Sequence, residues 1–210
     1  YLAWVGGLMH GDFGPSMDRT TSIGDQIGDR LGVTMRLVLL AMLIAVVIAV
    51  FVGVVSAVRQ YTWMDYVFTS FGFLMLAMPS FWLAVLLKQA GIWTNQSTGR
   101  TLFYTVGDRS VLPIDGLLPR LGDIVGHMIL PTITLVLIHF AAWSRFQRSS
   151  MLEVLNSDYI RLATAKGVPR RTVLLKYGVR TALAPMITVV ALDFTAVVAG
   201  AVITETVFQW

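Results

Sequence analysis

Four long apolar runs dominate this 210-residue chain, at about 33–58, 66–90, 126–146 and 183–207. A helix needs about 20 apolar residues to cross the hydrocarbon core of a bilayer, and each run is about that long. Hydrophobic residues make up 56% of the chain and charged residues only 13%, against roughly 25% charged in soluble domains. The sequence therefore predicts an all-α, polytopic helical membrane protein, with residues 33–210 as its membrane domain.

Small residues recur every fourth position along the first run, at Ala41, Ala45, Ala49, Gly53 and Ala57. Lipid removes the hydrophobic drive between helices, so close backbone approach along such a face is a main route to helix association. The stripe predicts a helix packed tightly against a neighbour. The alternative is chance spacing, since alanine is common in apolar spans.

Two prolines and one short periodic segment modify the runs. Pro79 removes a backbone hydrogen bond inside the second run and predicts a kink, either as a gate hinge or as a packing feature. Pro131 is expected in the first turns of the third helix, where its missing N–H costs least. Residues 23–31 repeat apolar side chains every fourth position, which fits either a helix lying on the membrane surface or a solvated approach to the first span.

Positive charge gathers in one connection. Eight of the 16 Lys and Arg residues lie at the end of the third run or in the connection that follows it: Arg145, Arg148, Arg161, Lys166, Arg170, Arg171, Lys176 and Arg180. The positive-inside rule places this connection, residues 147–182, in the cytoplasm. Because spans alternate, residues 1–32 and 92–125 are then extracytoplasmic, and the short connection 59–65 faces inward.

Within the basic connection, residues 158–181 have the pattern of two short helices joined by a sharp turn. Ser157 or Asp158 is suited to cap the first helix, and Gly167 suits its C-terminal stop. Pro169 fits the first position of the second helix. We call this segment the elbow, and we expect it to receive mechanical work from another subunit.

Two titratable residues, Asp193 and His139, fall near the middle of the runs. Asp193 lies in the fourth run, and an intramembrane acid usually faces a bundle interior or an aqueous cavity. It is either part of the lining of a translocation path or the acceptor of an interhelical hydrogen bond. His139 lies alone in the third run and is more simply explained by structure, and Pro79 completes the set of candidate path residues.

The sequence lacks the motifs of several common classes of enzyme and binding site. The chain has no GxxxxGK[ST] phosphate loop, no HExxH and no GxSxG motif, and it contains no cysteine. We therefore expect no enzyme activity, no metal site and no cofactor held by this chain. The basic connection lacks the aromatic residues of a nucleic-acid surface, so we expect no nucleic-acid partner.

The elbow sequence, DYIRLATAKGVPRRTVLLKYGVRTALAP, resembles the cytoplasmic EAA loop of ABC importer permeases. Gly167 matches the glycine of that pattern and Ala163 its second alanine, while Arg161 and Leu162 replace the glutamate and the first alanine. An arginine at that place is similar to the dipeptide and oligopeptide branch. GDFGPS at 11–16, MPSFWLAVLL at 78–87, HMILPTITL at 127–135, SMLEVLNSDYIR at 150–161 and AGAVITETVFQW at 199–210 extend the resemblance to B-type permeases of peptide importers.

The resemblance implies a type I ABC importer permease fold, with about four of six spans present in this chain. It implies a bacterial cytoplasmic membrane protein that works with a second, similar permease, two cytoplasmic ATPases that bind ATP and Mg²⁺, and an extracytoplasmic peptide-binding lipoprotein. It also implies that the elbow docks on an ATPase. The residues that it assigns to coupling are Asp158, Tyr159, Arg161, Ala163, Lys166, Gly167, Pro169 and Arg170.

Three other interpretations remain to be weighed. A polybasic lipid anchor needs only charge, at about 1 kcal/mol per residue near an anionic leaflet, and leaves the helix–glycine–helix pattern unexplained. An ion-gradient-driven transporter or channel would use Asp193 as its coupling acid, and transport would then survive loss of the ATPase. A membrane-embedded enzyme is disfavoured because no nucleophile, base and metal set can be assembled. The sequence does not separate dipeptides, longer peptides, metal chelates and glutathione as substrates.

Overall fold

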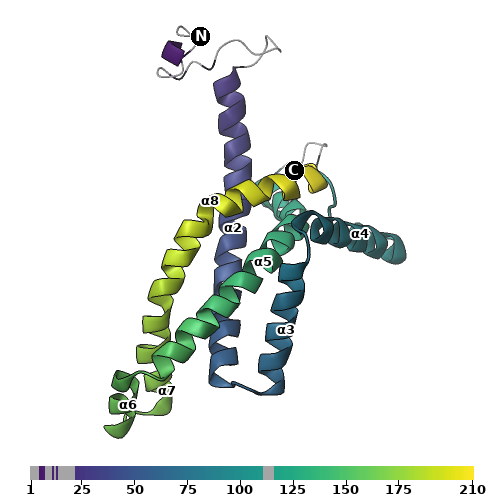
Figure 1. Ribbon diagram of the computed structural model, residues 1–210. Helices are drawn as coiled ribbons and strands as arrows, with labels where there is room; N and C mark the ends of the chain where they lie inside the picture. Colours follow the sequence, from purple (N-terminus) through teal and green to yellow (C-terminus); the bar gives the residue numbers. More distant parts are fainter. Residues whose placement is uncertain (1–4, 8–10, 12, 14–21, 111–115) are drawn as a thin grey trace.

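The computed structural model describes residues 5–7, 11, 13, 22–110 and 116–210 (Figure 1). All the regular secondary structure of the described part is helical, and it holds no strand. The predicted extracytoplasmic segment 1–32 is described in full only from residue 22 onward. Most of residues 1–21, including most of GDFGPS, lie outside the described residues. The helices are α2 (Ile23–Val58), α3 (Trp63–Ala77), α4 (Ser80–Thr98), α5 (Leu117–Leu155), α6 (Asp158–Ala165), α7 (Arg170–Thr172), the π-helix η1 (Val173–Val179) and α8 (Arg180–Phe208).

Three of the described helical stretches are long and apolar enough to cross a membrane: Ile23–Val58, Leu117–Leu155 and Arg170–Phe208. A fourth crossing exists if the bent pair α3 and α4 counts as one span. The all-α, polytopic prediction is thus confirmed. At 1.5 Å per residue, α2 is about 54 Å long, so it extends well beyond a hydrocarbon core of about 30 Å.

The segment 23–31 is not a separate surface helix. It forms the first turns of α2, and the Ser22 hydroxyl oxygen accepts a hydrogen bond from the Asp25 N–H at 3.1 Å to cap it. The apolar periodicity of this segment continues directly into the apolar run. One continuous helix therefore pairs the backbone N–H and C=O groups that a break between two helices would leave without intrahelical hydrogen bonds. In Figure 1 this part of α2 rises above the other helices.

The small-residue stripe of α2 is buried along its whole length, as predicted. Its principal neighbour is α5, which crosses it (Figure 1). At Gly53 a Cβ atom would come within 2.8 Å of both the Gln147 Cβ and the Ser144 carbonyl oxygen. Only glycine permits this approach, so the stripe is where α2 and α5 come into closest contact.

The second apolar run is broken rather than kinked. Pro79 is the N-cap of α4, in extended conformation, and α3 and α4 meet at an angle of 105°. Alone, α3 is about 22 Å long by its rise per residue, which is short of a full span. Figure 1 shows α4 lying across the direction of α3.

The prediction for Pro131 is wrong in its position. Helix α5 begins at Leu117, upstream of the apolar run, so Pro131 lies buried well inside the helix. The loss of one backbone bond is tolerated there because neighbouring helices surround it. Residues 117–125, which the sequence predicts as the end of the extracytoplasmic loop 92–125, form the first turns of α5.

The outer connection between α4 and α5 is held by polar contacts in its described part. Asp123 of α5 accepts from the Ser110 N–H at 2.8 Å and from the Ser110 hydroxyl at 2.5 Å. The ring of Tyr104 stacks on His127 with centroids 4.1 Å apart. The Gly107 N–H donates to the Phe208 carbonyl at 3.0 Å, which joins this connection to the end of α8.

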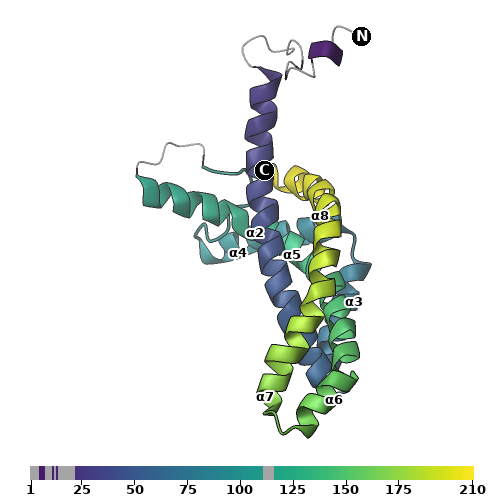
Figure 2. The same cartoon turned by 90° about the vertical axis from the view of Figure 1, so that its left-hand side faces the viewer.

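The elbow and the turn between α2 and α3 lie at one end of the molecule (Figures 1 and 2). The start of α2 and the described part of the connection between α4 and α5 lie toward the opposite end. The charge distribution predicts the same two groups, with the elbow and the α2–α3 turn on the cytoplasmic side of the membrane and the other connections on the outer side.

Candidate functional site

The first arm of the elbow is the short helix α6, which ends at a left-handed glycine. Gly167 has a φ of +75°. Its N–H donates to the Thr164 carbonyl at 3.0 Å, and the Val168 N–H donates to the Ala163 carbonyl at 3.2 Å. These two bonds form a Schellman motif, which satisfies carbonyls at the helix end and requires a residue that tolerates positive φ. The glycine therefore stops α6 as the sequence predicts.

The caps differ in detail from the prediction. Ser157 is the N-cap of α6, but its hydroxyl donates to the Val154 carbonyl at 2.5 Å, so it does not cap α6 through its side chain. Pro169 is the N-cap of α7 rather than its first residue. Its carbonyl accepts from Thr172 and Val173 at 2.8 and 3.0 Å, so the second arm begins one residue later than predicted.

One face of α6 is open. Tyr159 is 43% exposed and Leu162 57% exposed, whereas Ile160 on the other face is buried. Large apolar side chains and aromatic residues are enriched where proteins dock on one another. Arg161 and Asp158 form a solvent-exposed ion pair at 3.7 Å, which contributes little to stability. Of the coupling residues assigned by resemblance, Ala163 is half-buried and the others are exposed.

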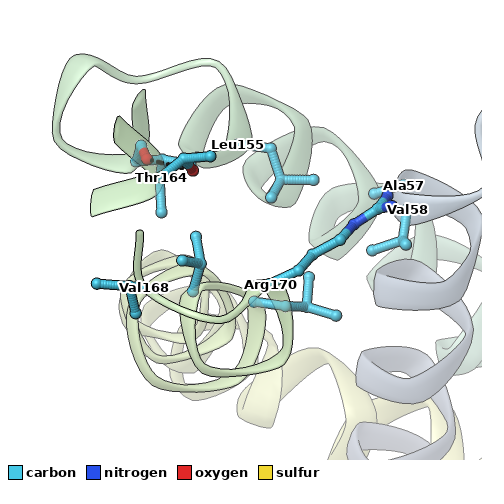
Figure 3. Close-up of a pocket in the computed structure, with 9 residues that line it drawn as sticks. Ala57, Val58, Leu155, Thr164, Val168 and Arg170 are labelled. Carbon is cyan, nitrogen blue, oxygen red and sulfur yellow. Dashed lines mark hydrogen bonds between the residues drawn. The ribbon is translucent and has the colours of Figure 1, made fainter. Parts of the chain in front are cut away.

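A cavity of about 320 Å³ lies behind the elbow (Figure 3). Its walls come from the end of α2, the end of α5, α6 and the second arm, and they include Ala57, Leu155, Thr164, Val168 and Arg170. Figure 3 shows the Arg170 side chain reaching across the cavity toward Ala57 and Val58. The elbow is therefore joined to the helices by its ends and is loosely packed behind its turn, an arrangement that permits displacement.

The second arm runs without a break into the last span. Helix α7 continues through η1 into α8, so the predicted second short helix is the cytoplasmic end of a long helix. At Gly178 a Cβ would come within 2.9 Å of the Met151 side chain, and the Ser150 hydroxyl donates to the Ala182 carbonyl at 3.2 Å. These contacts tie the second arm to α5. π-helical segments are rare and are frequent at functional sites.

Two of the three candidate path residues meet around one tryptophan. The Trp143 Nε1 donates to the Asp193 Oδ2 at 2.7 Å and so joins α5 to α8. The His139 ring lies 5.4 Å from the Trp143 ring, centroid to centroid. Asp193 and His139 are both half-buried, so neither residue is fully enclosed by the helices around it. Pro79 lies at the break between α3 and α4.

An ion pair that the sequence reasoning missed lies next to the elbow, with the Asp65 side chain 5% exposed and the Arg148 side chain 26% exposed. Arg148 of α5 donates to Asp65 of α3 through Nε to Oδ1 and through Nη2 to Oδ2, both at 2.8 Å. The Ser56 hydroxyl and the Tyr61 N–H, the latter at 3.0 Å, also donate to Asp65. The hydrogen bonds from Arg148 hold the pKa of Asp65 well below its ordinary value, although burial opposes this.

The signal for this pair is present in the sequence but weak. Asp65 is an acid in a short inward connection, and Arg148 begins the basic one. Counting Arg148 with the other basic residues for orientation hides its separate role. Among the described residues, no group of three or more His, Asp or Glu side chains is placed to hold a metal ion.

Comparisons of the sequence with known proteins identify a family and several relatives. Residues 45–210 match the family described as binding-protein-dependent transport system inner membrane component. The chain is 41% identical over 210 residues to the oligopeptide transport system permease protein OppB of Mycobacterium tuberculosis (strain ATCC 25618 / H37Rv), covering 100% of this chain and 64% of the relative.

Two further relatives come from other bacteria. Identity is 37% over 211 residues to the oligopeptide transport system permease protein AppB of Bacillus subtilis (strain 168), covering 100% of this chain and 64% of that protein. It is 34% over 226 residues to the dipeptide transport system permease protein DppB of Escherichia coli (strain K12), covering 100% and 66%. The chain thus spans a little under two thirds of the length of these relatives.

Proposed function

Because this chain belongs to the family of binding-protein-dependent transport system inner membrane components, we propose that it is the transmembrane permease subunit of an ATP-driven importer of di- or oligopeptides. Its relatives are named as permeases of oligopeptide and dipeptide transport systems, which supports the substrate class. The permease itself does not hydrolyse ATP. It forms half of the translocation path in a bacterial cytoplasmic membrane.

The observation that carries this proposal is the elbow. Its first arm, α6, is short, ends in a Schellman turn at Gly167 and exposes Tyr159 and Leu162. Both arms connect directly to long apolar helices, α5 and the helix that contains α8. A rigid, exposed element of this kind suits docking in a groove of another protein far better than it suits lipid attraction, for which charge alone is sufficient.

The proposed complex contains a second, similar permease, two cytoplasmic ATPases and an extracytoplasmic peptide-binding lipoprotein. ATP and Mg²⁺ bind to the ATPases, and no cofactor is held by this chain. Closure of the ATPase pair on ATP moves the docked elbow. In thermodynamic terms the nucleotide favours one of two global states, and the contact at the elbow differs in energy between them.

The residues of the elbow divide this work. Tyr159, Leu162 and Lys166 offer the exposed surface that meets the ATPase. Gly167 fixes the angle between the two arms through its left-handed backbone. Movement of the second arm reaches the path through α8, which carries Asp193, and movement of α5 carries Trp143 and His139. We propose that Asp193 and His139 border the path and that Pro79 is a hinge in its wall.

The experiment that tests this proposal uses the full-length permease, reconstituted with its partner subunits in vesicles. Peptide uptake should require ATP, stop when the catalytic residues of the ATPases are disabled, and persist when ionophores collapse proton and sodium gradients. Uptake that survives loss of ATP hydrolysis but stops with the ionophores would instead identify a transporter driven by an ion gradient, with Asp193 as its coupling acid.

A further inference from the structure

The cytoplasmic end of α3 is attached to the rest of the molecule in an unusual way. Helix α3 buries only three residues, Asp65, Gly72 and Met75. Gly72 and Met75 lie more than one turn beyond the first turn of α3. At the end of α3 nearest the elbow, the buried side chain is therefore the carboxylate of Asp65. Asp65 is 3% exposed. No apolar residue of the first two turns of α3 is fully buried beside it, although the half-buried Phe68 packs against the core.

The anchor has a fixed geometry. An arginine that donates from two nitrogens to both oxygens of one carboxylate holds the two groups in one plane. The Ser56 hydroxyl and the Tyr61 N–H donate to the same carboxylate, and Arg148 Nε also lies 3.2 Å from the Ser56 Oγ. Tyr61 has a positive φ of 63°, so the turn that presents its N–H is itself held in a constrained shape. The network therefore joins the end of α2, the α2–α3 turn and α5.

Arg148 lies on the part of α5 that leads to the elbow. Helix α5 ends at Leu155, and α6 begins at Asp158. A displacement that reaches the end of α5 through the elbow therefore reaches Arg148 within two turns of helix. Because the two hydrogen bonds fix the angle as well as the distance, Asp65 and the first turn of α3 must follow.

We propose that Arg148 and Asp65 form a joint that passes movement of the elbow to the α2–α3 hairpin, a role that rests on the proposed coupling function. The two are positioning residues: neither meets peptide nor nucleotide. An ion pair with one buried partner contributes little net stability compared with apolar residues of the same volume. What this pair supplies is a single geometry between α5 and α3, so that these two helices move as one body.

The test compares three variants of the full-length permease in the reconstituted complex. Asp65→Asn keeps the shape and removes the charge, whereas Arg148→Lys keeps the charge and removes the two-pronged bond. Arg59→Gln is the matched control, because Arg59 lies on the same turn and contacts the sulfur of Met64. The first two variants should lower peptide uptake per ATP hydrolysed by tenfold or more while the assembled complex still hydrolyses ATP, and the control should match the wild type.

A distance measurement separates a joint from a merely stabilising pair. The chain has no cysteine, so spin labels at Trp63→Cys and Glu153→Cys, both exposed positions, report the separation of α3 and α5. The joint predicts one narrow distance, unchanged between the nucleotide-free and ATP-bound states. In the Asp65→Asn background the distance should broaden and differ between the two states.

Two results would overturn the joint: a wild-type distance that changes with nucleotide, or normal uptake per ATP in Arg148→Lys. If Asp65→Asn prevents assembly, Arg148→Lys decides the question, because it retains a buried cation opposite the carboxylate. A wild-type complex without ATP-driven uptake would instead contradict the proposed function, so the two failures are distinguishable.

Discussion

Replacing Gly167 by valine perturbs the elbow at a point where the structure separates backbone from packing effects. A Cβ at this position meets no atom within 4 Å, so the substitution creates no clash. The cost comes from the backbone, which has a φ of +75°. An L-residue in the left-handed region costs roughly 1–2 kcal/mol, and β-branched residues are genuine outliers there.

This cost sets the size of the expected effect. A penalty of 1–2 kcal/mol corresponds to a factor of about 5–30 in an equilibrium. When the penalty falls on the docking-competent shape of the elbow, the apparent affinity for the ATPase weakens by up to that factor. Insertion in the membrane should be unaffected, because the apolar spans are unchanged. ATP-driven uptake at limiting ATPase concentration should fall by about the same factor as the affinity.

Asparagine is the matched control, because it tolerates the left-handed region better than other non-glycine residues. Gly167→Asn should therefore bind the ATPase nearly as the wild type does. The assay is titration of purified ATPase against detergent-solubilised full-length permease, followed by uptake in vesicles. Wild-type binding and uptake by Gly167→Val, or equal loss in the valine and asparagine variants, would refute the assignment of this turn as the docking element.

Three other outcomes can be measured. Gly53→Ala should destabilise the protein by about 1–3 kcal/mol in thermal unfolding, because its Cβ would clash with α5; Gly32→Ala, in open space on the same helix, should be neutral or stabilising by about 0.5–1 kcal/mol, and equal effects would contradict the close packing. Asp193→Asn keeps an acceptor for the Trp143 Nε1 but removes the charge, so a path role predicts slower uptake and altered peptide selectivity; if neither changes, Asp193 serves packing alone. Asp65→Asn should cost about 1.5–3 kcal/mol at neutral pH, the range for hydrogen bonds to charged groups, because the Arg148 side chain is 26% exposed and only Asp65 is fully buried. Because the pKa of Asp65 is depressed in the folded state, its stabilisation is present above the ordinary pKa of aspartate, near 3.9, and is lost as the pH falls below it; wild type and variant should therefore converge only in strong acid, and convergence near pH 6 would contradict the ion pair.

Local signals in the sequence were sufficient for the turn of the elbow. The stop at Gly167 follows from backbone conformation, which depends on residues within one turn. The stripe from Ala41 to Ala57 is likewise local, since its four-residue spacing already defines one face of a helix. In both cases the structure has the predicted feature.

The helix ends were harder to predict because hydropathy indicates which residues lie in the hydrocarbon core of the membrane, and not where a helix begins or ends. Helix α5 continues to Leu155 through Arg145 and Arg148, and η1 carries Lys176. Outside the hydrocarbon, charged residues cost a helix nothing, so the helices extend past the apolar runs. The same reasoning misplaced the start of α5 and therefore the position of Pro131 within it.

Contacts between distant residues could not be predicted from one sequence. Asp65 and Arg148 are 83 residues apart, and Trp143 and Asp193 are 50 apart. Nothing in the local pattern of either pair specifies its partner. The break at Pro79 also exceeds a proline kink, since the angle of 105° depends on how α4 packs against α5 and α8.

The central claim is that the elbow is the contact through which an ATPase moves this permease. A single cysteine at Leu162, which is 57% exposed on α6, allows attachment of a reducible photo-crosslinker in the reconstituted complex. The same label at Leu117, which is 74% exposed, serves as the control at the start of α5. The account predicts that the label at residue 162 crosslinks to the ATPase and stops uptake until the linker is reduced, while the control does neither. Crosslinks from residue 162 only to lipid or to the permease, with uptake intact, would contradict it.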